Sequence, residues 1–131
     1  MAQVLSLDHV GLVVLDLPAA LRFFGDVLGL ATLQRWRSPE SGLEAVMLDA
    51  GRGALELLCF DRQFAPQTHA DPFRQPGLRH LTLTVDALDE MHRRLETAGF
   101  PILIPPRAGN YFKRFMFVQG PEGILLEMVE A

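Results

Sequence analysis

Two stretches of sequence decide the fold: LDHVGLVVLDL at residues 7–17 and LRHLTLTVDAL at residues 78–88. They align without a gap, with apolar residues opposite apolar residues at most positions, and the third residue of each is a histidine, His9 and His80. Each stretch leads into a helical pattern that ends at a glycine. Repetition of such landmarks at a fixed offset is typical of a fold built from copies of one unit. The chain is therefore predicted to contain two modules with the same order of elements.

Two glutamates repeat with the same spacing as the histidines. Glu56 lies 47 residues after His9, and Glu127 lies 47 residues after His80. Each of the four residues lies on a different predicted strand, and in each strand the opposite face is apolar. A buried carboxylate is unfavourable unless a cation compensates it. Two imidazoles and two carboxylates form a nitrogen and oxygen ligand set that suits a divalent metal ion, so these four residues are the predicted ligands.

The expected fold class is α+β, with two tandem β-α-β-β-β modules forming curved mixed sheets around a metal site. Module one spans residues 4–60, a linker with three prolines spans 61–77, and module two spans 78–131. In module one we expect a helix from Pro18 to a left-handed cap at Gly29, with Leu21, Phe24 and Leu28 on one face, and strands at 4–14, 31–37, 43–49 and 54–60. In module two we expect a helix at 87–98 and strands at 78–86, 101–104, 112–119 and 124–129.

Composition narrows the function classes. The chain has 131 residues, 49% of them hydrophobic, and a net charge of −4 without a long basic run. A nucleic-acid or membrane partner is therefore disfavoured, and we expect a single domain in the cytoplasm. Cys59 is the only cysteine, which excludes an intrachain disulfide and fits a reducing compartment.

The sequence resembles the vicinal-oxygen-chelate superfamily, which includes glyoxalase I, extradiol dioxygenases and bleomycin resistance proteins. The resemblance covers essentially the whole chain. It rests on the opening strand and helix LDHVGLVVLDLPAALRFFGDVLGL (7–30), the second opening GLRHLTLTVDALD (77–89) and the closing hairpin FVQGPEGILLEMVE (117–130). The family's ligand positions fall on His9, Glu56, His80 and Glu127, and this His/Glu/His/Glu set most resembles that of glyoxalase I.

The resemblance implies a metal-dependent lyase or isomerase that acts on a small substrate with vicinal oxygens through a metal-stabilised enediolate. Ni²⁺, Co²⁺, Zn²⁺ or Mn²⁺ would suit the site. The resemblance favours Glu127 as the base, and Glu56 remains the alternative. It also implies a homodimer, with or without exchange of modules between chains.

Two alternatives stay open. The first is a ring-cleaving extradiol dioxygenase that holds Fe(II) with His9, His80 and Glu127. The second is a non-catalytic protein that binds or sequesters a small molecule or drug. In addition, Val13 and Phe60 are apolar where similar glyoxalase I enzymes carry polar residues that hold glutathione, so we expect no dependence on glutathione.

Overall fold

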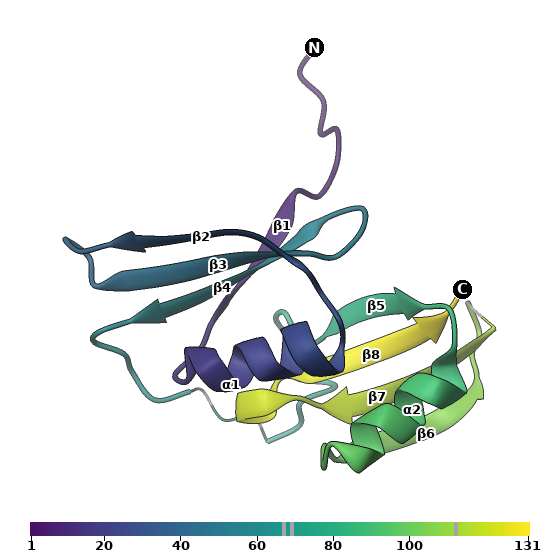
Figure 1. Ribbon diagram of the computed structural model, residues 1–131. Coiled ribbons are helices and arrows are strands. Elements are labelled where there is room, and N and C mark those ends of the chain that lie inside the picture. The colour runs from purple at the N-terminus through teal and green to yellow at the C-terminus, as the bar shows by residue number, and fades with distance from the viewer. Residues whose placement is uncertain (67, 69, 112) are drawn as a thin grey trace. The chain divides into compact units, whose positions relative to one another are not determined.

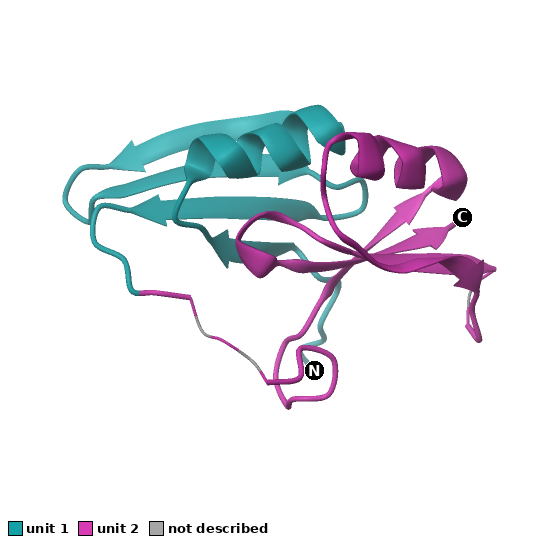
Figure 2. Cartoon of the chain, turned by 90° about the horizontal axis from the view of Figure 1, so that it is seen from below, with its two compact units in different colours: residues 1–64 teal, residues 65–131 magenta. Residues whose placement is uncertain are grey.

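The computed structural model describes residues 1–66, 68, 70–111 and 113–131. The chain divides into two compact units, residues 1–64 and residues 65–131 (Figure 2). Each unit contains one four-stranded sheet with parallel and antiparallel pairs, so the α+β class with two modules is confirmed. Parts of the predicted linker and of the predicted strand 112–119, namely positions 67, 69 and 112, lie outside the described residues.

Unit 1 has the strand order β1-β4-β3-β2 (Figure 1). Its strands are β1 (His9–Val13), β2 (Thr32–Ser38), β3 (Leu43–Asp49) and β4 (Ala54–Phe60). The bounds of β3 and β4 are those predicted from the turn residues around them. Strand β1 runs parallel to β4, while β2–β3 and β3–β4 are antiparallel pairs.

The prediction that the first strand starts at residue 4 is wrong. Strand β4 begins at Ala54, which pairs with His9, so residues 4–8 have no strand residue opposite them. Val4 and Leu5 are accordingly 94% and 92% exposed. A pattern of Val and Leu indicates that a segment can form a strand, but the length of its partner decides where the strand stops.

The first helix begins as predicted. Helix α1 (Leu17–Leu21) has Pro18 in its first turn, and the Asp16 carboxylate accepts a hydrogen bond of 2.9 Å from the N–H of Ala19. This N-cap satisfies a backbone donor that has no partner within the helix. Gly29 follows with φ of +81°, the left-handed conformation expected of a helix-ending glycine.

The continuation of this helix differs from the prediction. Residues Arg22–Val27 form a π-helical segment, η1, in which the N–H of Leu28 donates to the carbonyl of Phe23 at 2.9 Å. A hydrogen bond from the N–H of residue i+5 to the carbonyl of residue i widens the helical turn. The buried face of this segment therefore cannot be predicted from the 3.6-residue period of an α-helix. Two consecutive rings, Phe23 and Phe24, are therefore both buried and pack edge to face at 4.9 Å, whereas Leu28 is only half-buried.

Unit 2 repeats the arrangement with the strand order β5-β8-β7-β6 (Figure 1). Its strands are β5 (Leu81–Val85), β6 (Ile102–Ala108), β7 (Arg114–Gln119) and β8 (Leu125–Glu130), its helix is α2 (Leu88–Thr97), and a 3-10 turn, η2 (Pro121–Gly123), joins the last two strands. Strand β5 is parallel to β8, as β1 is to β4.

Strand β6 is longer than the predicted segment 101–104 because it continues through Pro105 and Pro106. It lies at the edge of the sheet, where a proline has no hydrogen-bond partner to lose on its outer side. The register with β7 shifts between Ile104 and Arg107, as expected of a bulge that accommodates the two prolines.

The inner strands β4 and β8 each have one apolar face that packs into the core and one face that carries a glutamate. Leu55 and Leu57 of β4 and Leu126 and Met128 of β8 are at most 2% exposed, and within their own units α1 contacts β4 and α2 contacts β6, β7 and β8. The opposite faces of the same strands carry the two predicted glutamate ligands. No helix in the described part of the chain is long and apolar enough to cross a membrane.

The buried side of α2 allows a test of the core of unit 2. Leu95 is completely buried, so Leu95→Ala should lower the free energy of unfolding by about 2–5 kcal/mol through lost burial and the cavity left behind. Urea denaturation followed by circular dichroism measures this change. Leu78→Ala is the matched control, because Leu78 is 95% exposed and its truncation should change the stability little. Equal losses in both variants would contradict the assigned core.

Candidate metal site

Unit 1 brings His9 and Glu56 together. In the parallel pairing of β1 and β4, His9 is opposite Ala54 and Gly11 is opposite Glu56, so the two side chains lie on one face. The His9 Nε2 atom is 3.9 Å from the Glu56 Oε1 atom. The Glu56 side chain is only 17% exposed, and that of His9 is 38% exposed.

Gly11 keeps the space beside this carboxylate open. A Cβ atom at position 11 would lie 3.3 Å from Leu58 Cδ1 and 3.7 Å from Glu56 Oε1. Any side chain longer than a methyl group would therefore enter the space in front of Glu56. The first unit thus presents a carboxylate with room around it.

Asp8 orients the His9 ring. Its Oδ2 atom lies 2.6 Å from His9 Nδ1, within hydrogen-bond distance. This hydrogen bond, reinforced by the charges of Glu56 and Asp8, raises the pKa of His9 above its usual value of 6.5. In neutral His9 the proton stays on Nδ1, so Nε2 offers its lone pair on the side of Glu56. A carboxylate that holds the far nitrogen of a histidine is the usual second partner of a metal-ligating imidazole.

Unit 2 brings His80 and Glu127 together. His80 lies just before β5, and its Nε2 atom is 3.7 Å from the Glu127 Oε1 atom. Glu127 is 8% exposed, the one buried charged residue in the described part of the chain. Thr82 is paired with Glu127 across β5 and β8, and its hydroxyl donates a hydrogen bond of 2.9 Å to Oε1.

The donors present fit a divalent cation. Two atoms that each lie about 2.1 Å from one ion can be at most about 4.2 Å apart, and both His–Glu distances are shorter than this limit. The same two distances are too long for hydrogen bonds, so the histidine and the glutamate of each pair do not hydrogen-bond to each other. Glu127 is buried with one hydroxyl donor, a setting in which a cation offsets the cost of desolvating the charge.

Within either unit, the described residues include no group of three or more His, Cys, Asp or Glu side chains that could hold a metal ion. Each unit therefore supplies a pair of candidate ligands. That His9, Glu56, His80 and Glu127 share one ion remains a prediction.

Sequence reasoning overlooked several partners of these residues. Asp8 was detectable, because an aspartate directly before the histidine can reach the ring. Thr82 was also detectable, because it lies two residues after His80 and therefore on the same face of the predicted strand. The contact of the His80 ring with Phe117 could not be found, because no local pattern shows which residue of another strand packs against it.

Comparisons with known proteins show the family of the chain. Residues 6–128 match the model of a family described as Glyoxalase/Bleomycin resistance protein/Dioxygenase superfamily. The YwkD protein of Bacillus subtilis (strain 168), described as uncharacterized, is 30% identical over 129 residues, which cover 95% of this chain and 96% of that protein.

Solved structures that are similar over most of the chain include the following two. The crystal structure of SMU.1112c has a TM-score of 0.83 at 24% identity and covers 98% of this chain and 100% of its own, which shows the fold. The trypanothione-dependent glyoxalase I of Leishmania major has a TM-score of 0.74 at 25% identity, with 93% of this chain and 84% of that chain covered.

The contact between Asp8 and His9 predicts a change in titration. In metal-free protein, Asp8→Asn should lower the pKa of His9 toward about 6.5, because asparagine carries no charge to hold the ring proton. A group with a raised pKa stabilises the fold below its unfolded pKa, and this stabilisation is lost as the pH rises through its folded pKa. The wild type should therefore exceed the variant in melting temperature more at pH 5 than at pH 8.

NMR titration of the His9 ring protons measures the pKa directly. Asp26→Asn removes an exposed carboxylate elsewhere in unit 1 and should leave the titration of His9 unchanged. A His9 midpoint that is identical in wild type and Asp8→Asn would show that the hydrogen bond does not form in solution.

Proposed function

The chain belongs to the Glyoxalase/Bleomycin resistance protein/Dioxygenase superfamily, and on this premise we propose that it is a metal-dependent lyase or isomerase acting on a small substrate with vicinal oxygens. The observation that carries the proposal is the presence in each unit of a histidine nitrogen less than 4 Å from a largely buried carboxylate. Two neutral imidazoles and two carboxylates balance the charge of a divalent ion. Ni²⁺, Co²⁺, Zn²⁺ and Mn²⁺ all accept this ligand set.

His9, Glu56, His80 and Glu127 would hold the ion, and the chain's other residues prepare them for it. Asp8 keeps the proton of neutral His9 on Nδ1, so that Nε2 is free to bind. A divalent ion in such a site polarises the substrate's oxygens and stabilises the negative charge that develops on them.

Glu127 is the residue to which we assign proton transfer. The Thr82 hydroxyl orients its carboxylate through Oε1, which leaves Oε2 to take a proton from the substrate carbon and return it to the neighbouring carbon. Burial strengthens this step, because a carboxylate that is shielded from water interacts more strongly with a substrate proton. Glu56 is the alternative base. The residue paired with it is Gly11, which has no hydroxyl group to orient the carboxylate as Thr82 orients Glu127.

The apolar residues near unit 1's pair limit the substrates. Val13 follows His9 on the same face of β1 and is 62% exposed, and Phe60 ends the strand that carries Glu56. Neither side chain offers a partner to the charged ends of a glutathione arm. We therefore assign the chain a substrate that is not carried on glutathione. A homodimer is part of the same proposal.

A first test concerns the metal. The purified protein should take up about one divalent ion per chain, and chelation should lower its melting temperature, because an ion that binds only the folded state stabilises it. Glu56→Gln should weaken metal binding by about tenfold or more, which corresponds to about 1.4 kcal/mol. Titration calorimetry and elemental analysis measure these quantities. Glu40→Gln, at an exposed turn, is the matched control.

The same variants separate the proposed enzyme from the two alternatives. A ring-cleaving dioxygenase would bind Fe(II) equally well after Glu56→Gln and would consume oxygen with catechols. A sequestering protein would bind small molecules without turning them over. Absence of metal in the purified protein, together with no uptake of Ni²⁺, Co²⁺, Zn²⁺, Mn²⁺ or Fe²⁺, would overturn the proposal.

A further test concerns glutathione. The metal-loaded protein should show little or no turnover of the hemithioacetal of methylglyoxal and glutathione, because Val13 and Phe60 leave the charges of glutathione without partners. Formation of lactoylglutathione is followed by ultraviolet absorbance. A kcat/KM above about 10⁴ M⁻¹s⁻¹, an ordinary value for an enzyme with its own substrate, would contradict this assignment.

A further inference from the structure

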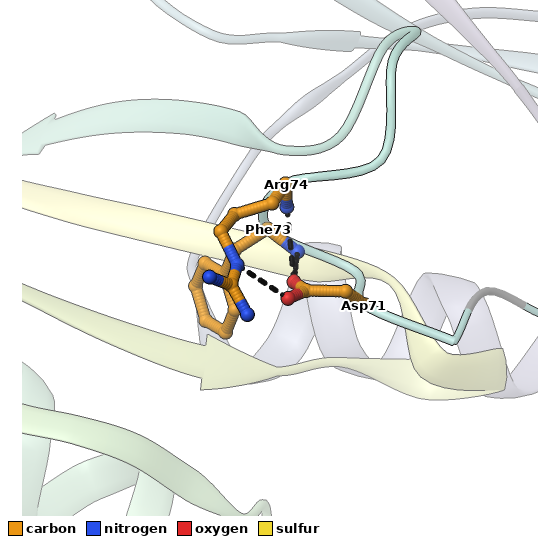
Figure 3. Close-up of polar contacts among 3 residues, drawn as sticks. All are labelled: Asp71, Phe73 and Arg74. Atoms are coloured by element: carbon orange, nitrogen blue, oxygen red, sulfur yellow. Dashed lines mark hydrogen bonds and ion pairs between the residues drawn. The ribbon is translucent and has the colours of Figure 1, made fainter.

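A rigid turn precedes the second histidine. In the segment 71–75, which we call the Asp71 turn, the Asp71 Oδ1 atom accepts hydrogen bonds of 3.0 Å from the N–H groups of both Phe73 and Arg74 (Figure 3). Its Oδ2 atom accepts one of 2.6 Å from Arg74 Nε. The Arg74 side chain and these backbone donors hold the pKa of Asp71 below its usual value. Aspartate followed by proline, here Pro72, is the sequence that such a turn favours.

The turn holds Phe73 against Phe117, the ring that packs against His80. The Phe73 ring meets the Phe117 ring edge to face, with centroids 5.2 Å apart. Phe117 in turn meets the His80 ring at 5.3 Å and the Phe115 ring at 6.0 Å, again edge to face. One candidate ligand of the site is thus part of an aromatic cluster that begins in the Asp71 turn.

The register of the sheet puts this cluster on the same face as the second carboxylate. Phe117 is paired with Glu127, and Glu127 is paired with Thr82, so the three side chains form one row across β7, β8 and β5. The next row contains Phe115, and the guanidinium of Arg107 lies 5.6 Å from its ring centroid. A ligand beside His80 and Glu127 would therefore meet aromatic surface on that face.

The exposed fractions of the two rings show which of them a ligand could contact. Phe117 is 7% exposed, and so it is already covered by its neighbours. Phe73 is 42% exposed, although a turn with three hydrogen bonds to one carboxylate fixes its backbone. A half-exposed ring with a fixed backbone, one ring away from His80, is suited to stack with a flat apolar group, because it loses little conformational freedom on binding.

We infer that Phe73 is a specificity-determining residue whose exposed ring, supported from behind by Phe117, forms a subsite for an aryl or similarly flat apolar substituent of the substrate. This inference rests on the proposed function, because the substituent adjoins the oxygens held beside His80 and Glu127. It assigns the substrate to aryl-substituted compounds with vicinal oxygens. Asp71 is a positioning residue that acts through Phe73.

The first arm of the test needs no metal. In metal-free protein with labelled phenylalanine and histidine rings, benzamide should shift the NMR signals of Phe73, Phe117 and His80, whereas acetamide should not. Phe73→Ala should abolish the shifts at the other two rings, and Phe64→Ala should preserve them, because Phe64 is 96% exposed. If benzamide shifts none of these signals in the wild type, the inference is wrong, whatever the metal does.

The second arm uses the metal-loaded protein and two inert chelators with vicinal oxygens, benzohydroxamate and acetohydroxamate. Calorimetry should give a Kd ratio in favour of benzohydroxamate that is about tenfold larger in the wild type than in Phe73→Ala, a difference of about 1.4 kcal/mol. Asp71→Ala should reduce the ratio as well, although every ring is still present. Phe73→Leu provides a second variant if the alanine variant does not fold.

The two arms distinguish the possible failures. A ratio that is the same in wild type, Phe73→Ala and Phe73→Leu would overturn the inference and leave the proposed metal chemistry intact. A positive benzamide experiment combined with no binding of either hydroxamate would support the aromatic subsite and count against the metal site. A purely structural role of Phe73 would lower the melting temperature of the variants without changing the ratio.

Discussion

The parallel pairing of a histidine-bearing strand with a glutamate-bearing strand is the constraint on which each unit depends. β1 lies beside β4 and β5 beside β8, so residues 47 positions apart in the chain become neighbours on one sheet face. Parallel neighbours cannot be joined by a tight turn, and in each unit a helix and two further strands occupy the connection. The opposite face of the inner strand packs into the core, which leaves the carboxylate little freedom to move.

The two copies have diverged around this shared plan. In unit 1 the residue before the histidine is Asp8, which holds the far ring nitrogen; the residue before His80 is Arg79, and the ring instead packs against Phe117. The residues paired with the two glutamates differ as well. Gly11, opposite Glu56, leaves space beside that carboxylate, whereas Thr82, opposite Glu127, donates a hydrogen bond to it. The first pair therefore has a carboxylate and a glycine as neighbours, while the second has an aromatic ring and a hydroxyl, although the exposures of the two pairs are similar.

Much of the fold was predictable because its signals are local. Turn residues at 38–42 and 50–53 allowed the start and end of β3 and the start of β4 to be predicted correctly, and Pro18 and Gly29 marked the start of α1 and the end of the helical stretch that η1 continues. The failures have non-local causes. Residues 4–8 lack a partner strand, Pro105 and Pro106 are tolerated because β6 is an edge, and the π-turn at Phe23 makes two adjacent rings buried.

The repeated plan and the pairing of His9 with Glu56 and of His80 with Glu127 can be predicted from the amino-acid sequence, because strand alternation and equal spacing are visible along the chain. The sequence also contained Asp8, one residue from its target. The side chains that surround the second pair are known only from the folded chain. Phe73 meets Phe117 through a turn in a segment without regular periodicity, and Phe117 in turn meets His80 and is paired with Glu127 through strand register. Such contacts join residues that are distant in the chain, and no local pattern encodes them, because they depend on how complete elements pack.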